Sequence, residues 1–104
     1  MFKEILPQLY KEAKNSLLKD GEIEFASQLD SCLIKSCESL ASDDSAFTVN
    51  FEGFVSDIIE DTFPSGSKKH TVMVCYSNTH KVIGIDVFGC ENTKLQQELQ
   101  AACI

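Results

Sequence analysis

The sequence predicts a single α+β domain with an N-terminal helix hairpin, a three-stranded antiparallel sheet and a C-terminal helix. Near both ends of the chain, apolar residues recur at three- and four-residue steps, the period of an amphipathic helix. Through the middle they alternate with polar residues, as in a half-buried strand. The 104 residues, 43% of them hydrophobic and 24% charged, match one compact domain, so we take residues 1–104 as a single unit.

The first predicted helix has an apolar stripe with a proline inside it. The stripe consists of Phe2, Ile5, Leu6, Leu9, Ala13 and Leu17. Because proline lacks an N–H and clashes with the preceding turn, we expect the regular helix to begin near Pro7, after a separate turn over residues 2–6. Gly21 is expected to stop the helix in the left-handed conformation.

A second stripe predicts a helix from about Phe25 to Ala41, where the polar run SDDS ends it. Its members are Phe25, Leu29, Cys32, Leu33, Cys37 and Leu40. The connection between the two helices is short, so we expect them to be antiparallel, each stripe covering the other helix or a sheet.

Three later segments have the alternation or the β-branched and aromatic content of strands. They are FTVNFEGFV (47–55), HTVMVCYS (70–77) and KVIGIDVFG (81–89). The short polar turn around SNTH makes the last two an antiparallel hairpin. The final strand has one uniformly apolar face and one mixed face: Ile83, Ile85 and Val87 against Gly84, Asp86 and Phe88.

Two further segments are predicted to be helical. FVSDIIEDTF (54–63), between the first and second strands, has helical spacing but also directly continues a strand pattern. We favour a short acidic helical turn, because Ser56 resembles an N-cap and Asp57 and Glu60 fall in the first turn. The following PSGSKK is expected to be a loop. In NTKLQQELQAACI, apolar residues at helical spacing predict a C-terminal helix, with Asn92 or Thr93 as the N-cap.

Charge is distributed unevenly along the chain. Residues 36–67 contain seven acids and no lysine or arginine, which accounts for the whole formal charge of −7, while the flanking regions nearly cancel. The chain contains no arginine for bidentate phosphate contacts. This pattern argues against nucleic acid and against an anionic membrane surface as partners.

An acidic surface favours a basic protein partner, because complementary potentials speed encounter. We therefore predict a non-enzymatic protein that binds and neutralises such a partner, as an immunity protein or antitoxin neutralises a nuclease-type toxin. The predicted contact residues are Asp43, Asp44, Glu52, Asp57, Glu60 and Asp61. The competing interpretation is that the acidic residues only keep the protein soluble.

The alternative function is that of a dimeric secretion chaperone or adaptor that holds another polypeptide. In that case the stripe of the first helix, together with Phe54 and Phe63, would be an interface. Simple burial of the stripe is the competing interpretation, because a domain this small needs most of its apolar residues for its own core. The sequence leaves the oligomeric state open.

No cofactor or metal is predicted. A zinc site from His70, Cys75, His80 and Cys90 would require ligands that strand parity sends to opposite faces. The five cysteines have no CxxC pair, so a disulfide framework is not indicated and the cysteines are expected to pack as small apolar residues. No apolar stretch is long enough for a membrane span and charges interrupt the N-terminal region, so we expect a cytoplasmic protein.

Overall fold

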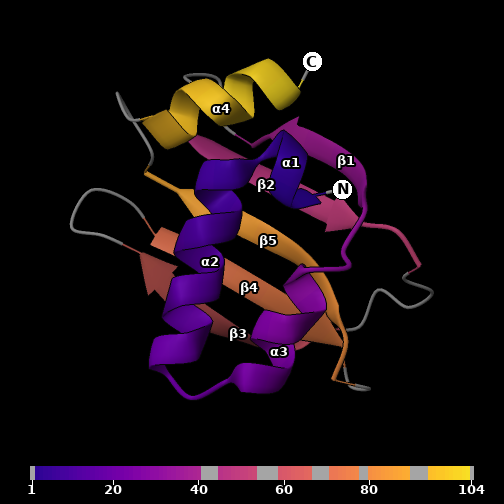
Figure 1. Cartoon of the computed structure of the whole chain (residues 1–104). Coiled ribbons are helices and arrows are strands. Elements are labelled where there is room, and N and C mark those ends of the chain that lie inside the picture. The colour runs from indigo at the N-terminus through magenta and orange to yellow at the C-terminus, as the bar shows by residue number, and fades with distance from the viewer. Residues whose placement is uncertain are drawn as a thin grey trace.

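In the part of the chain that it describes, the computed structural model places four helices and a five-stranded antiparallel sheet in two layers (Figure 1). It describes residues 2–40, 45–53, 59–66, 71–77, 80–89 and 94–103, and for residues 59–66 the backbone alone. The elements are α1 (Phe2–Ile5), α2 (Pro7–Lys19), α3 (Ile23–Leu29), β1 (Ile34–Ser39), β2 (Ala46–Phe51), β3 (Ile59–Gly66), β4 (Thr71–Ser77), β5 (Val82–Phe88) and α4 (Lys94–Ala102). The strand order is β1-β2-β5-β4-β3. The α+β class is confirmed, but the expectation of three strands is wrong.

Helices α1 and α2 begin and end where the sequence predicts. The chain breaks between α1 and α2 at Leu6, and Pro7 is the first residue of α2. Gly21 has a φ of 80°. Its N–H donates to the carbonyl of Leu18, and the N–H of Glu22 donates to the carbonyl of Leu17, which together form a Schellman motif. Proline and glycine therefore set both limits of α2.

The predicted second helix is wrong beyond residue 29. Helix α3 ends at Leu29, and the chain continues as edge strand β1, which pairs with β2. The register shifts between Ile34 and Ser36, so an extra residue is present in β1. Such a bulge places Ile34 and Cys37, three residues apart, on the same face of the sheet. The predicted stripe used Leu33, Cys37 and Leu40 instead, and Leu33 and Leu40, which flank β1, are 45% and 53% exposed, so the helical spacing did not mark a buried face.

The acidic helical turn is also wrong where it can be compared. Residues 54–58 lie outside the described part of the chain, but residues 59–63 belong to β3, the other edge strand, rather than to a helix. Pro64 and Gly66, expected in a loop, end the same strand. An edge strand tolerates proline because one of its sides needs no backbone donors.

Strands β4 and β5 confirm the last two predicted strands, and β2 confirms the first only as far as Phe51, because Glu52 and Gly53 form a turn and residues 54 and 55 lie outside the described part of the chain. Ile85 and Val87 face the helices and are completely buried, as are Val49 on β2 and Val74 on β4. The core forms between this inner face of the sheet and the helices. Helix α1 closes one end of it, since the ring of Phe2 lies 5.1 Å from that of Phe51.

Helix α4 lies beside α2 at the β1 end of the sheet (Figure 1). It confirms the predicted C-terminal helix, although Asn92 and Thr93, the predicted caps, lie outside the described residues. Leu95 and Leu99 enter the core. In the described part of the chain, no helix combines the length and apolar character needed to cross a bilayer.

A disulfide bond joins Cys37 of β1 to Cys103, which directly follows α4. The two residues are 66 positions apart, and their Cα atoms lie 4.9 Å apart. The expectation of unpaired cysteines is therefore wrong for this pair. Cys32 and Cys75 are free thiols, as expected. Spacing rules could not find the bond, because it depends on which elements the fold brings together.

Candidate functional site

Glu52 is the one predicted contact residue whose side chain the structure describes. It directly follows β2 and is exposed. Its N–H donates to the carbonyl of Leu33 at 2.7 Å, and Gly53 then turns the chain with a φ of 85°. Glu60 and Asp61 lie in β3, where only the backbone is described. The other predicted contact residues lie outside the described part of the chain: Asp43, Asp44 and Asp57.

The sheet register places Glu52, Glu60 and Asp61 at one end of the sheet. Asp61 lies opposite Tyr76 of β4, and Tyr76 lies opposite Val82 of β5. Antiparallel extension of the β2–β5 pairing brings Glu52 level with Val82. The end of β2 and the start of β3 are therefore three strand spacings apart, or about 14 Å.

The segment that contains Asp43 and Asp44 begins and ends at the opposite end of the sheet. Leu40 follows β1 there, and its N–H donates to the carbonyl of Ala46 at 2.8 Å. Strand β2 separates this end from Glu52 by about 20 Å. Whether the six predicted acids form one surface stays a prediction.

The structure shows another surface that carries two carboxylates, Glu38 and Asp86, and we call it the open face of the sheet. Strand pairing assigns alternate residues to the side opposite the buried core, and no helix of the described part packs on that side. By this alternation the open face contains Ser36, Glu38, Ala46, Thr48, Asn50, Thr71, Met73, Cys75, Gly84, Asp86 and Phe88, of which Cys75 is buried and Phe88 is 41% exposed. In cross-strand order, Glu38 lies opposite Thr48, Thr48 opposite Asp86, and Asp86 opposite Met73.

Hydrogen bonds between neighbouring strands hold the polar side chains of the open face. The hydroxyl of Thr48 donates to Asp86 Oδ1 at 2.7 Å. The side-chain amide of Asn50 donates to the hydroxyl of Ser36 at 3.0 Å. Because their positions are held before a partner arrives, less side-chain freedom is lost on binding.

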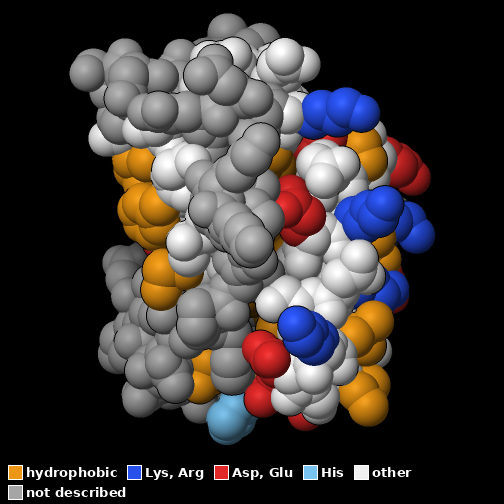
Figure 2. Space-filling view, turned by 90° about the vertical axis from the view of Figure 1, so that its left-hand side faces the viewer, with side chains coloured by type: hydrophobic (Ala, Val, Ile, Leu, Met, Phe, Trp, Pro, Cys, Tyr) orange, Lys and Arg blue, Asp and Glu red, His pale blue; other side chains and the backbone are white. Residues whose placement is uncertain are grey.

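Lysines are concentrated in the helix layer, whereas carboxylates occur in both layers and include Glu4, Glu12, Glu24 and Glu98 on the helices. Glu38 is exposed and Asp86 is half-buried on the open face, and Lys35, at the bulge of β1, is the one lysine within strands β1 to β5. Helices α1 and α2 carry four lysines: Lys3, Lys11, Lys14 and Lys19. In Figure 2 the lysine side chains gather on the right-hand side, where the helices lie. The open face therefore has the charge sign that favours a cationic partner.

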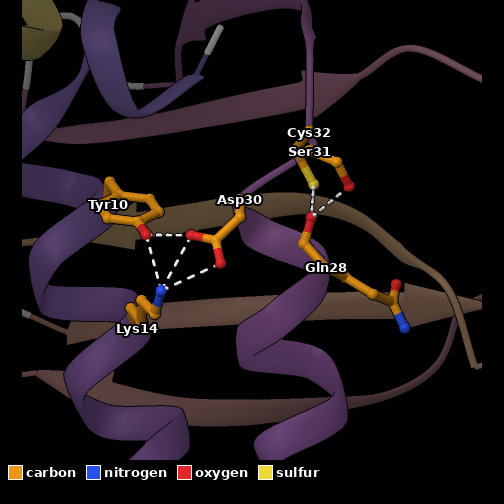
Figure 3. A network of polar contacts seen from close by, with 6 residues as sticks. All are labelled: Tyr10, Lys14, Gln28, Asp30, Ser31 and Cys32. Carbon is orange, nitrogen blue, oxygen red and sulfur yellow. Dashed lines mark hydrogen bonds and ion pairs between the residues drawn. The ribbon is translucent and has the colours of Figure 1, made fainter.

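A polar cluster on the helix layer links α2 to the end of α3 (Figure 3). The Tyr10 hydroxyl donates to Asp30, and Lys14 Nζ donates to Tyr10 Oη at 2.8 Å and to Asp30 Oδ1 at 2.9 Å. Hydrogen bonds from Tyr10 and then from Lys14 lower the pKa of Asp30, and those to Tyr10 and Asp30 raise the pKa of Lys14. Because the three groups serve one another as partners, we interpret the cluster as a link between helices.

The free cysteines are poor candidates for nucleophilic chemistry. Burial, and then the charge of Asp86, raises the pKa of the Cys75 thiol to about 12. Burial, and then the charge of Asp30, raises the pKa of Cys32 to about 11. Both are thiols rather than nucleophilic thiolates near neutral pH. Among the residues described, no three or more His, Cys, Asp and Glu side chains converge to hold a metal ion, and His70 and Cys90 lie outside this set.

Sequence reasoning assigned no role to Thr48 and Asp86, the central pair of the open face. A signal was present, because the mixed face of the last predicted strand contains Asp86 between Gly84 and Phe88. Gly84 also marks a close approach of strands, since a Cβ at this position would lie 2.6 Å from the carbonyl oxygen of Val49. What the sequence lacked was the identity of the neighbouring strands. No family model, curated protein or solved structure matches this chain.

Proposed function

We propose that the protein is a non-enzymatic inhibitor that binds a basic protein, such as a nuclease-type toxin, through its acidic sheet layer. The observation that carries this proposal is the open face, where Glu38 and Asp86 flank Thr48 with no helix of the described chain above them. A nuclease must present cations to phosphate, so an acidic cover is complementary to its active surface.

The acidic segment 36–67 supports the same sign of partner. Glu38 of this segment belongs to the open face, and Glu52 lies at one end of the sheet. Complementary charge accelerates association, and salt screens it over about 8–10 Å near physiological ionic strength. The association rate should therefore fall steeply as salt is added, while the dissociation rate changes less.

The test uses the product of the reading frame adjacent to the gene, co-expressed with this protein. We expect a stoichiometric complex in which the nuclease activity of that product is suppressed. Two charge-neutralised variants address the two acidic regions: Glu38→Gln with Asp86→Asn, and Asp57→Asn with Glu60→Gln and Asp61→Asn. Each should raise the dissociation constant by about tenfold or more if its residues contact the partner.

Glu24→Gln is the matched control, because Glu24 is an exposed acid of the helix layer. It removes one charge without touching the sheet, so binding should change little. If the control weakened binding as much as both sheet variants, the effect would come from net charge and not from the proposed surface. Unchanged binding in both sheet variants would contradict the proposed surface.

The dimeric chaperone is a weaker second candidate, because the structure removes most of its proposed interface. Apart from Ile5, which is 53% exposed, the stripe of the first predicted helix is buried in the core. Phe54 lies outside the described residues, and the side chain of Phe63 is not described. A dimer on size exclusion would have to use another surface.

A further inference from the structure

We propose that the Cys37–Cys103 disulfide is a thiol-exchange switch that holds α4 and the edge strand β1 in place, and that its reduction loosens both. Its effect on partner binding rests on the proposed function, since β1 carries Glu38 and Ser36 of the open face. The switch itself is a property of the fold and can be tested without any partner.

The position of Cys37 couples the disulfide to the open face. Cys37 lies between Ser36 and Glu38 in β1, lies opposite Val49 and packs against the core, while its two neighbours belong to the open face. Strand β1 is at the edge of the sheet, and β2 is its one partner among the described strands. An edge strand with a bulge has few other constraints, and the bond to Cys103 is therefore a large share of what orders it.

The position of Cys103 couples the same bond to helix α2. Helix α4 inserts two buried leucines, Leu95 and Leu99, and contacts α2 and β1. Between these leucines, Glu98 accepts the N–H of Gln8 at 2.9 Å and the N–H of Leu9 at 3.1 Å. A carboxylate from α4 thus satisfies two of the free donors at the start of α2. Release of α4 removes this cap.

The chemistry is exchange with an external dithiol. A thiolate of the dithiol attacks one sulfur of the Cys37–Cys103 bond and forms a mixed disulfide, and its second thiol then displaces the cysteine. Two electrons and two protons pass to the protein, which gains two thiols, and the dithiol becomes a disulfide. Both cysteines are half-buried rather than enclosed, so a small dithiol can reach them.

The remaining described cysteines do not compete in this exchange. Cys32 is half-buried and Cys75 is buried. Because the attacking species is the thiolate, their raised pKa values leave the Cys37–Cys103 pair as the reactive one among the described cysteines. The bond can therefore open and close again without shuffling to these two positions.

The experiment compares oxidised protein with protein reduced by dithiothreitol, using hydrogen exchange of individual backbone amides. The reporters are Gln8 and Leu9 at the cap of α2, and Ser36 and Glu38 in β1. Leu40 N–H points toward β2, so by alternation Ser36 and Glu38 also donate to that strand. Reduction should speed exchange at all four by about tenfold or more, while Val74 and Ile85 in the central strands change less.

Two variants control the assignment. Cys37→Ser with Cys103→Ser should exchange like the reduced protein without any reductant, and Cys32→Ser should keep the full response to dithiothreitol. Equal exchange at the four reporters in both redox states would overturn the switch. Equal acceleration at Val74 and Ile85 would also overturn it, because the bond would then hold the whole domain together. Neither outcome depends on partner binding, so failure of the switch can be distinguished from failure of the proposed function.

Discussion

The two faces of the sheet are built from the same strands but perform different tasks. On β2, Phe47, Val49 and Phe51 face the helices and are buried, while Thr48 and Asn50 between them belong to the open face. The inner face stabilises the fold by removing apolar area from water. The open face contributes hydrogen bonds and carboxylates, whose net effect on stability is small. Adjacent residues can therefore be changed to affect folding or binding separately.

The largest expected difference between the faces comes from neighbouring residues of β2. Phe47→Ala should lower the free energy of unfolding by about 3–5 kcal/mol, because it leaves a cavity under the helices. Thr48→Ala removes the hydrogen bond to Asp86 and should cost about 1 kcal/mol. Urea unfolding of both variants measures the difference. Similar costs would show that the two faces do not differ as described.

The second effect tests how closely β2 and β5 approach. An added methyl group at an unobstructed glycine usually stabilises a protein by about 0.4–1 kcal/mol. At Gly84 it would meet the backbone carbonyl of Val49 at 2.6 Å, which cannot rotate away. Gly84→Ala should therefore destabilise the protein by about 1–3 kcal/mol in thermal or urea unfolding. A gain in stability would indicate wider strand spacing.

The third prediction concerns the cluster that ties the helix layer together. The pKa of Asp30 is lowered in the folded protein, so its contribution to stability is present above its ordinary pKa of 3.8 and is lost as pH falls through the lowered value. Asp30→Asn should lower the melting temperature at pH 7, with the difference shrinking in acid. Tyr10→Phe should show the same trend more weakly. A difference independent of pH would contradict this linkage.

The smallest effect on stability is expected on the open face itself. Glu38→Gln with Asp86→Asn should change the free energy of unfolding by about 0.5 kcal/mol or less, since the amide of residue 86 can still accept from Thr48. Urea unfolding beside Glu24→Gln checks this. A large loss of stability would mean that Asp86 belongs to the structural framework and would complicate its use in the binding test.

Local sequence signals identified most elements but not all of their limits. Pro7 and Gly21 delimit α2 because each acts on its own backbone, and the short β4–β5 turn predicts its hairpin for the same reason. The segment from Leu33 to Leu40 was misassigned, because Leu33, Cys37 and Leu40 have helical spacing although Leu33 and Leu40 are exposed beside β1. Part of the acidic turn became β3 through pairing with β4, a partner that local periodicity cannot identify.

From the sequence alone, the candidate site could be predicted only as a region of negative charge. The sequence indicates an acidic region and a basic partner, and it separates the two faces of β5. It does not indicate that Glu38 and Asp86 share one face with Thr48 between them. Strands β1, β2 and β5 are neighbours in the sheet although they are spread over residues 34–88 of the chain.

The sequence by itself determined the fold class, the limits of α2, the β4–β5 hairpin and the concentration of negative charge in residues 36–67. The tertiary structure alone decided that residues 34–39 form an edge strand, that Cys37 pairs with Cys103, and that none of the described helices packs on the open face. The physical reason is the separation along the chain over which each interaction acts. Periodicity, caps and turns act between neighbours in the chain, whereas strand pairing and disulfide formation depend on residues that only the folded chain brings together.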